Sequence, residues 1–301
     1  MRIGIDLGGT KIEGIALTAS GAVLGRERVP TPSSYDGTIR AIQELIEHLE
    51  RPLALRGSVG VGIPGAVSPE TGRVKNANSA WLIGQPLGDD LEVALARPVR
   101  LANDANCFAL SEATDGAAAG AGVVFGVIMG TGVGGGIVVH GIPLVGANLI
   151  AGEWGHNPLP WPTASELPGP PCYCGKAGCI ESWISGPGVA ADHERVTGHA
   201  LATPAVMAAA RAGDPSASAT HARFIHRTAR SLATVINVLD PEVVVLGGGM
   251  SNVDGLAAAV TAELPHWVFS DQVHTRVVQN THGDSSGVRG AAWLWPVGQW
   301  A

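Results

Sequence analysis

The pattern Ile3-Gly-Ile-Asp-Leu-Gly-Gly-Thr-Lys-Ile-Glu-Gly-Ile-Ala-Leu17 occurs twice in the chain. It aligns without a gap with Phe125-Gly-Val-Ile-Met-Gly-Thr-Gly-Val-Gly-Gly-Gly-Ile-Val-Val139, and Gly4, Gly8 and Gly14 fall on Gly126, Gly130 and Gly136. Each copy is typical of a strand, a glycine turn and a second strand. The repeat predicts a duplicated α/β fold with a cleft between the copies; a chance likeness of two glycine-rich hairpins is the alternative.

Apolar periodicity places the remaining elements. Asp36 is the expected N-cap of a helix whose apolar residues end at Leu49. A helical stripe runs from Phe224 to Leu239 and stops before Asp240-Pro241. The other expected elements are strands Ser58–Ile63, Val99–Ala102 and Glu242–Leu246, helices Cys107–Glu112, Val253–Leu264 and Val288–Trp295, and a loop over Pro158–Pro171. The last helix is expected to pack back on the first domain, which predicts one domain of residues 1–115 plus 288–301 and another of 116–287.

Composition excludes several classes of protein. Of the 301 residues, 46% are hydrophobic and 15% charged, which is globular composition, and a net charge of -7 argues against nucleic-acid binding. The stretch from Gly116 to Gly152 carries no Asp, Glu, Lys or Arg, but glycines break it into strand-length pieces, so a buried hairpin is expected and not a membrane span. With no signal peptide at Met1, we expect a cytoplasmic protein.

The turn Asp6-Leu-Gly-Gly-Thr-Lys11 is the first candidate for phosphate chemistry. Gly8 and Gly9 let the backbone approach a phosphate, Thr10 adds a hydroxyl, and Asp6 can hold Mg²⁺ directly or through water. An ordinary hairpin turn is the alternative. The matching turn Gly130-Thr131-Gly132 has no acid, and Gly247-Gly248-Gly249 lies between a strand and a helix, where adenosine or its phosphates can bind.

Asn103 and Asp104 follow a predicted strand. Phosphoryl transfer to a sugar requires a carboxylate that orients the attacking hydroxyl and accepts its proton, and an asparagine can hydrogen-bond sugar hydroxyls. The pair therefore predicts a base at Asp104 and a sugar contact at Asn103. A local turn with a helix N-cap is the alternative.

A metal-binding pattern follows the second hairpin. Glu153-Trp-Gly-His156 precedes Cys172-Tyr-Cys174-Gly-Lys-Ala-Gly-Cys179, and three thiolates with one imidazole form a closed, structural zinc site. Packed or redox-active cysteines are the alternative. Zinc there would direct Glu153, which can accept sugar hydroxyls, and Glu181 toward one pocket. The remaining cysteine, Cys107, is expected to be a small buried residue.

Taken together, these motifs resemble the ROK family of repressors, uncharacterised proteins and sugar kinases. The resemblance covers essentially the whole chain and implies the duplicated actin/hexokinase-like (ribonuclease H-like) ATPase fold, with two domains around a cleft. It implies ATP and Mg²⁺ as cofactors, Asp104 as the catalytic base and a homodimer. The positions it matches to sugar contacts are Gly65, Asn103, Glu153, His156 and Glu181, and those it matches to zinc ligands are His156, Cys172, Cys174 and Cys179.

Within that family the chain looks most like bacterial fructokinases that also accept mannose. Gly62-Ile-Pro-Gly65, Lys75-Asn-Ala-Asn-Ser79 and the stretch from Ala151 to Trp161 carry this closer likeness. The spacer between His156 and Cys172 is longer than is typical of the family, which bears on the choice of sugar. Glucokinase and N-acetylhexosamine kinase are the alternatives.

Three rival functions follow from the same residues. A repressor of this family has a winged-helix domain before the ATPase-like part, whereas here the Asp6 motif starts the chain. A plain ATPase has no use for Asn103-Asp104 together with a zinc loop. A catalytically dead sugar-binding module is disfavoured because every expected catalytic position is occupied. The sequence thus predicts an ATP-dependent hexose kinase.

Overall fold

The computed structural model describes residues 1–77 and 79–296. The chain folds into two compact units: the first is Met1–Gly120, Gly136–Ala151 and Thr281–Ala301, and the second is Ala121–Gly135 and Gly152–Asn280. Asn78 of the Lys75–Ser79 motif, and residues 297–301 of the expected first domain, lie outside the described residues.

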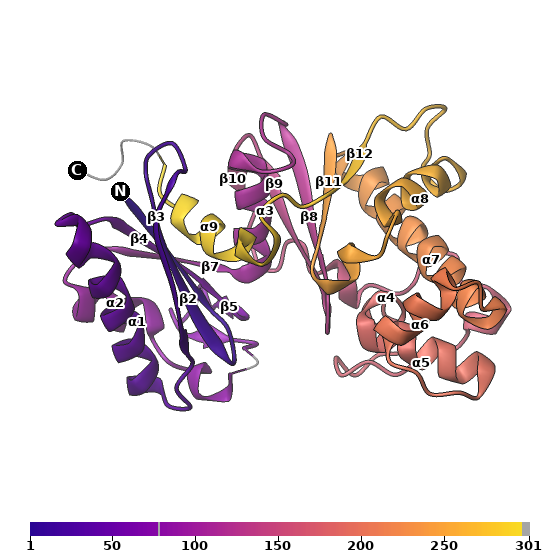
Figure 1. The fold of residues 1–301 in the computed structure, drawn as a ribbon, viewed down its shortest axis with the longest axis horizontal. Helices are drawn as coiled ribbons and strands as arrows, with labels where there is room; N and C mark the ends of the chain where they lie inside the picture. The colour runs from indigo at the N-terminus through magenta and orange to yellow at the C-terminus, as the bar shows by residue number, and fades with distance from the viewer. Residues whose placement is uncertain (78, 297–301) are drawn as a thin grey trace. The chain divides into compact units, whose positions relative to one another are not determined.

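The first unit is built on a five-stranded sheet of order β3-β2-β1-β4-β7 (Figure 1). Strand β1 pairs antiparallel with β2, and β2 with β3, whereas β1, β4 and β7 are mutually parallel neighbours. The strands are β1 (Arg2–Leu7), β2 (Lys11–Leu17), β3 (Val23–Pro30), β4 (Ser58–Ile63) and β7 (Val99–Asn103). The short strands β5 (Ala66–Val67) and β6 (Val74–Lys75) form a separate ribbon.

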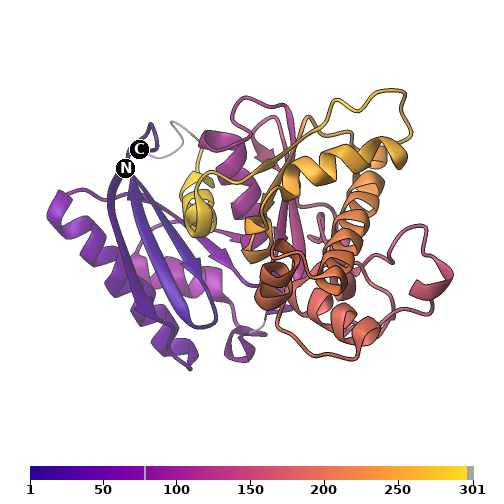
Figure 2. The same cartoon turned by 45° about the vertical axis from the view of Figure 1, so that its right-hand side comes forward.

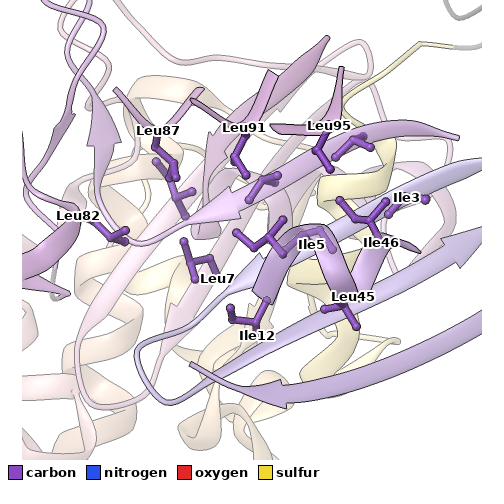
Figure 3. Packing of buried hydrophobic residues seen from close by; sticks show 14 of the residues in the cluster. Ile3, Ile5, Leu7, Ile12, Leu45, Ile46, Leu82, Leu87, Leu91 and Leu95 are labelled. Carbon is purple, nitrogen blue, oxygen red and sulfur yellow. The ribbon is translucent and has the colours of Figure 1, made fainter. Parts of the chain in front are cut away.

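Helices α1 (Tyr35–Glu50) and α2 (Leu87–Leu95) pack on one face of this sheet, and Figure 3 shows buried side chains of the core between them. Their apolar stripes, which include Leu45, Ile46 and Leu91, pack on Ile3 and Ile5 of β1. The apolar residues that recur at helical spacing in α1 and α2 pack against the buried residues of β1 and form this core. The N-cap of α1 is Ser34, whose hydroxyl accepts from the amide of Gly37, and not Asp36 as expected; Asp36 lies in the first turn of the helix.

The opposite face carries α9 (Ser286–Trp293), which packs on β1 and β4 and on α3 (Asp104–Asp115). This helix confirms the prediction that the segment near Val288–Trp295 returns to the first sheet. Glycines allow the approach, because a Cβ atom at Gly290 would lie 1.6 Å from the carbonyl oxygen of Cys107. Added Cβ atoms at Gly4 and Gly60 would likewise lie 2.0 Å and 1.9 Å from carbonyl oxygens of α9.

The second five-stranded sheet has the order β10-β9-β8-β11-β12. Its strands are β8 (Val123–Met129), β9 (Val133–Val139), β10 (Ile142–Pro143), β11 (Val243–Gly247) and β12 (Arg276–Gln279). Strand β8 is parallel to β11, and β11 to β12, so an antiparallel hairpin is again followed by parallel strands in the same order. The shared strand order confirms the duplication that the repeated glycine pattern predicts.

Within the described residues, the helices of the second unit follow the Cys172–Cys179 segment in the chain, four before β11 and one after it, and appear in pink to orange in Figure 2. They are α4 (Glu181–Ile184), α5 (Gly186–Thr197), α6 (Thr203–Arg211), α7 (Pro215–Leu239) and α8 (Leu256–Glu263). The end of α7 at Leu239 confirms the stop predicted before Asp240-Pro241. In the described part of the chain, no helix has both the length and the apolarity to cross a bilayer.

Replacing Gly290 with alanine is expected to destabilise the protein by about 3 kcal/mol, because the new methyl group overlaps the backbone of α3 and both helices must shift. The matched control is Gly88→Ala in α2, where an added Cβ meets its nearest atom, a Leu101 methyl carbon, at 3.4 Å. Chemical denaturation of both variants measures the effect. Equal unfolding free energies for the two variants would contradict the proposed packing constraint.

Candidate active site

The predicted residues of the first unit gather at one edge of its sheet. Asp6, Gly65 and Asn103 lie at or just beyond the carboxyl ends of the parallel strands β1, β4 and β7. Ligands of open α/β sheets bind at this edge. The structure therefore brings together three sequence-predicted groups that are far apart in the chain.

The turn after β1 is closed by backbone hydrogen bonds. The amide of Gly8 donates to the carbonyl oxygen of Lys11 at 3.0 Å, and the hydroxyl of Thr31 donates to the Gly8 carbonyl at 2.7 Å. Gly9 and Thr10 are exposed, so the turn presents its backbone to solvent. Such a turn can accept a phosphate without a basic side chain.

Asp6 occupies a carboxylate-rich environment. Burial, reinforced by the negative charges of Asp104 and Glu13 and opposed by Lys11 and Arg28, raises its pKa to about 6. Glu13 faces Asp6 across the β1–β2 pair and is itself neutralised by Arg26 at 2.5 Å and Arg28 at 2.7 Å. A cation near Asp6 and Asp104 would relieve this repulsion, which suits the predicted binding of Mg²⁺.

Asn103 and Asp104 form the start of α3. The Asn103 side-chain oxygen accepts from the amide of Ala105 at 2.9 Å, and its amide group donates to the carbonyl oxygen of Gly65 at 2.9 Å. Asp104 also accepts from the Ala105 amide, at 2.8 Å. The N-cap alternative is thus correct as a description of Asn103, and the same contacts fix the first turn of α3 against Gly65.

Cys107 lies on the next part of α3 and is fully buried. Burial, together with the charges of Asp6 and Asp104, raises the pKa of its thiol well above the ordinary value. The expectation of a small buried cysteine is confirmed.

A cavity of about 700 Å³ lies in the second unit. Gly130, Thr131 and Gly249 line it, so two of the predicted glycine loops reach the same space. Gly248 has φ +77 and lies against Met129 so closely that a Cβ atom would be 2.4 Å from the Met129 carbonyl oxygen. This contact brings the end of β11 beside the turn after β8.

The remaining lining was not anticipated from the sequence. It comes from α5, α6 and α7 and from the segment after β11: Gly186, Pro187, Thr203, Pro204, Met207, Ala210, Arg211, His221, Met250, Asn252, Val253 and Asp254. The prolines, methionines and Val253 make part of this lining apolar, while Arg211, His221 and Asp254 make part of it polar. The amino-terminal end of α5 adds a partial positive charge. Pro at the second position of α5 and of α6 is the sequence signal that marks the starts of these two helices.

His156, Cys172, Cys174 and Cys179 come together in the second unit, with their ligand atoms within 4.8 Å of one another. The imidazole Nδ1 of His156 lies 3.6 Å from the Cys172 sulfur, while its Nε2 pairs with the Tyr173 hydroxyl at 2.9 Å. Three sulfurs and one imidazole nitrogen are the donor set of closed tetrahedral zinc sites. These four residues fit the predicted zinc, and together they would supply four protein ligands to it.

The two glutamates that flank this cluster differ. Glu153 is exposed just before the turn Trp154–His156. Glu181 begins α4, and its Oε2 accepts from the backbone amide of Val133 at 2.8 Å. Glu181 is thus partly engaged with the turn after β8, a contact that the sequence did not predict.

The long spacer between His156 and Cys172 is tied to α7 by a buried ion-pair network. Glu166 accepts from Arg227 at 2.8 Å and from Arg230 at 2.8 Å, and Arg230 also donates to the carbonyl oxygen of Trp161. Burial raises the pKa of Glu166, but hydrogen bonds from Arg227, the Thr163 amide and Arg230 outweigh it and lower the pKa to about 2. The Pro158–Pro171 loop is therefore firmly anchored.

Comparison with known proteins places this chain in the ROK family, whose profile matches residues 2–297, and the chain belongs to that family. It is 39% identical over 299 residues to an N-acetyl-D-glucosamine kinase of Salmonella newport (strain SL254), covering 98% of this chain and 99% of that protein. A ROK hexokinase from Thermus thermophilus superposes with a TM-score of 0.86 at 32% identity, covering 97% of this chain and 96% of that one.

A ROK family glucokinase from Streptomyces griseus, solved in complex with glucose and AMPPNP, superposes with a TM-score of 0.76 at 27% identity over 97% of both chains. The resemblance to ROK sugar kinases and the actin/hexokinase-like fold expected from it are confirmed. The narrower prediction of a fructokinase finds no specific support, since the curated relative carries another activity in its name.

Asp6→Asn is expected to raise the melting temperature at pH 7.5 by several degrees in the absence of ligands. The folded-state pKa of about 6 lies above the ordinary value near 4, so the stability that proton binding contributes is complete below about pH 4 and is lost as the pH rises through about 6. Asparagine has no charge to bury, so the variant avoids this loss of stability. Its gain in melting temperature over wild type should shrink toward zero at pH 4.5. Thermal melts at both pH values, with the exposed Asp271→Asn as control, measure it. Identical melting points for Asp6→Asn and wild type at pH 7.5 would refute the raised pKa of Asp6.

Proposed function

We propose that this protein is an ATP-dependent N-acetyl-D-glucosamine kinase that transfers the γ-phosphoryl group of ATP to a hydroxyl of the sugar. The observation that carries the choice of sugar is the 39% identity to an N-acetyl-D-glucosamine kinase over nearly the full length of both chains. A hexose kinase acting on glucose is the second candidate, favoured by the likeness to the hexokinase and the glucokinase.

The nucleotide is assigned to the cavity of the second unit. Its apolar lining at Met207, Pro204 and Met250 suits an adenine ring, and the turn Gly130–Gly132 offers backbone amides and the Thr131 hydroxyl to phosphates. Donor preference for ATP is supported by the glucokinase solved with AMPPNP. Asp6 and the turn Gly8–Lys11 of the first unit are assigned to binding of the metal and of phosphates.

The sugar is assigned to Gly65, Asn103, Asp104, Glu153, His156 and Glu181. Asp104 accepts the proton of the attacking hydroxyl while a bond forms between that oxygen and the γ-phosphorus and the bond to the β-phosphate oxygen breaks. Asn103 and the Gly65 carbonyl hold the first turn of α3, and so Asp104, in place. Asp6 would hold Mg²⁺, which would supply positive charge that stabilises the phosphates.

Zinc is assigned to His156, Cys172, Cys174 and Cys179 in a structural role, because all four tetrahedral positions come from the chain. The homodimer and the cytoplasmic location expected from the sequence stay predictions.

The substrate is tested by coupled ADP release with MgATP and N-acetyl-D-glucosamine, N-acetylmannosamine, glucose, fructose or mannose, against a reaction without sugar. We expect the highest kcat/KM with N-acetyl-D-glucosamine. A higher value with glucose supports the second candidate, and a higher value with fructose supports the earlier prediction. ADP release that is equal with and without sugar would remove the protein from the sugar kinases.

Asp104→Asn is expected to lower kcat by at least about 10³-fold, because the amide cannot accept the proton of the attacking hydroxyl. Sugar affinity, measured by calorimetry, should change little, since the amide retains a hydrogen-bonding oxygen. The control is Asp115→Asn, at the far end of the same helix, which lies outside the proposed site. Turnover of Asp104→Asn near the wild-type rate would exclude Asp104 as the base.

A further inference from the structure

The turn Gly130–Val133 is assigned above to the nucleotide phosphates. It contacts two chain segments that flank the Cys₃His cluster formed by His156, Cys172, Cys174 and Cys179. We propose that the cluster positions this turn, and that Glu181 is the positioning residue through which much of the effect passes. The inference rests on the proposed function, because it takes the turn to be the phosphate-binding one. It gives the metal a task on the nucleotide side in addition to the arrangement of sugar contacts.

The segment after Cys179 holds both ends of the turn. Oε2 of Glu181 accepts from the Val133 amide at 2.8 Å, and the amide of Gly186 donates to the carbonyl oxygen of Gly130 at 2.8 Å. The carboxylate lies so close that a Cβ atom at Gly132 would be 2.6 Å from the same oxygen. The turn therefore rests directly on the start of α4 and the start of α5.

The segment before His156 holds the turn from a second direction. The indole N–H of Trp154 donates to the carbonyl oxygen of Gly134 at 3.0 Å, and a Cβ atom at Gly155 would lie 2.1 Å from the Val133 carbonyl oxygen. Trp154 is 4% exposed and meets Phe125 of β8 edge to face. Its position is thus fixed on the strand that leads into the turn.

The cluster joins these two segments. His156 and Cys179 contribute ligand atoms to the same group of four, and Glu181 follows Cys179 by only two residues. Apart from the metal ligands, the segments are linked by the Ile180 amide, which donates to the Asn157 carbonyl oxygen at 2.9 Å, and by the Leu159 amide, which donates to the Gly178 carbonyl oxygen at 2.8 Å. Coordination of one ion by both segments fixes their separation, and with it the turn between Glu181 and Trp154.

This positioning role is compatible with a sugar contact at Glu181. The bond to Val133 uses Oε2, and a carboxylate has a second oxygen with its own lone pairs. The two roles make different demands on a substitution. Support of the turn needs one acceptor oxygen, which glutamine also provides, and it matters even when sugar is absent.

The test is calorimetric binding of MgAMPPNP to the full-length, zinc-loaded protein without sugar. Glu181→Ala is expected to weaken binding about tenfold, because the turn loses a charge-assisted hydrogen bond. Glu181→Gln should remain within about threefold of wild type, since its amide oxygen accepts from the same amide. The matched control Glu194→Ala, which removes an exposed glutamate of α5 outside the proposed site, should leave MgAMPPNP affinity unchanged.

The outcomes separate the two proposals. Wild-type protein that binds no MgAMPPNP defeats the proposed function itself. Wild-type protein that binds, with Glu181→Ala binding equally well, defeats only the positioning role. The positioning role is also defeated if Glu181→Gln weakens MgAMPPNP binding as much as Glu181→Ala does. The loss of affinity would then come from the lost negative charge and not from the lost hydrogen-bond acceptor.

A second measurement needs no variant and so does not depend on whether Glu181→Ala folds. Hydrogen exchange is followed in the Gly130–Gly134 region of wild-type protein with zinc and after its removal by a chelator, with zinc content measured in parallel. We expect the Val133 amide to be protected with zinc and to exchange at least about tenfold faster without it. Unchanged protection in zinc-free protein that retains its helical circular-dichroism signal would overturn the inference.

Discussion

The close contact of α9 with the first sheet is the constraint on which the first unit depends. Backbone lies on backbone at Gly4, Gly60 and Gly290, where no side chain larger than hydrogen fits without movement. The same helix packs on α3, whose first turn carries Asn103 and Asp104. Helix α9, from the end of the chain, thus helps to hold α3, and with it Asp104, in place relative to strands β1 and β4.

A comparable arrangement of short contacts fixes the second unit, although it is built from different chemistry. There Gly248 against Met129 brings two strand ends together, and the segments around the metal cluster hold the turn between β8 and β9. Both units contain largely buried ion pairs, Arg97 with Glu50 in the first and Arg230 with Glu166 in the second, whereas the described His156, Cys172, Cys174 and Cys179 donor group lies in the second. The repeated strand order thus carries different local contacts in its two copies.

Much of this architecture could be predicted from the sequence because local patterns determine it. The glycine repeat predicted two hairpins in a duplicated α/β fold, and Asp240-Pro241 after the apolar stripe of α7 predicted where that helix ends. Its start at Pro215 was not predicted, because the predicted stripe begins at Phe224. Spacing alone predicted the His156–Cys179 donor group, since thiols and imidazole at such spacing have few other common uses. Ser34 displaced Asp36 as a cap because both residue types cap helices, and only the backbone geometry decides between neighbours.

The remaining features depend on distances that no local pattern carries. Met207 and Met250 line one cavity from segments far apart in the chain, and as apolar residues they show no chemical signature in the sequence. The bond from Glu181 to the Val133 amide joins a side chain to a backbone group, which any residue can supply. The available sequence signal was that Glu181 follows the predicted metal ligand Cys179 by two residues. That spacing placed Glu181 near the site but did not indicate the Val133 amide as its partner.

The burial of Cys107 has a practical consequence for chemical labelling. Its thiol is fully buried, and burial together with the charges of Asp6 and Asp104 raises its pKa and keeps it protonated at neutral pH, so alkylating reagents that attack thiolates react with it slowly. Cys172 and Cys174 are at least partly exposed, and a metal bound at the proposed site would mask them by coordination. Alkylation of the native protein would thus report mainly on Cys172 and Cys174, and its extent would measure the fraction of metal-free protein.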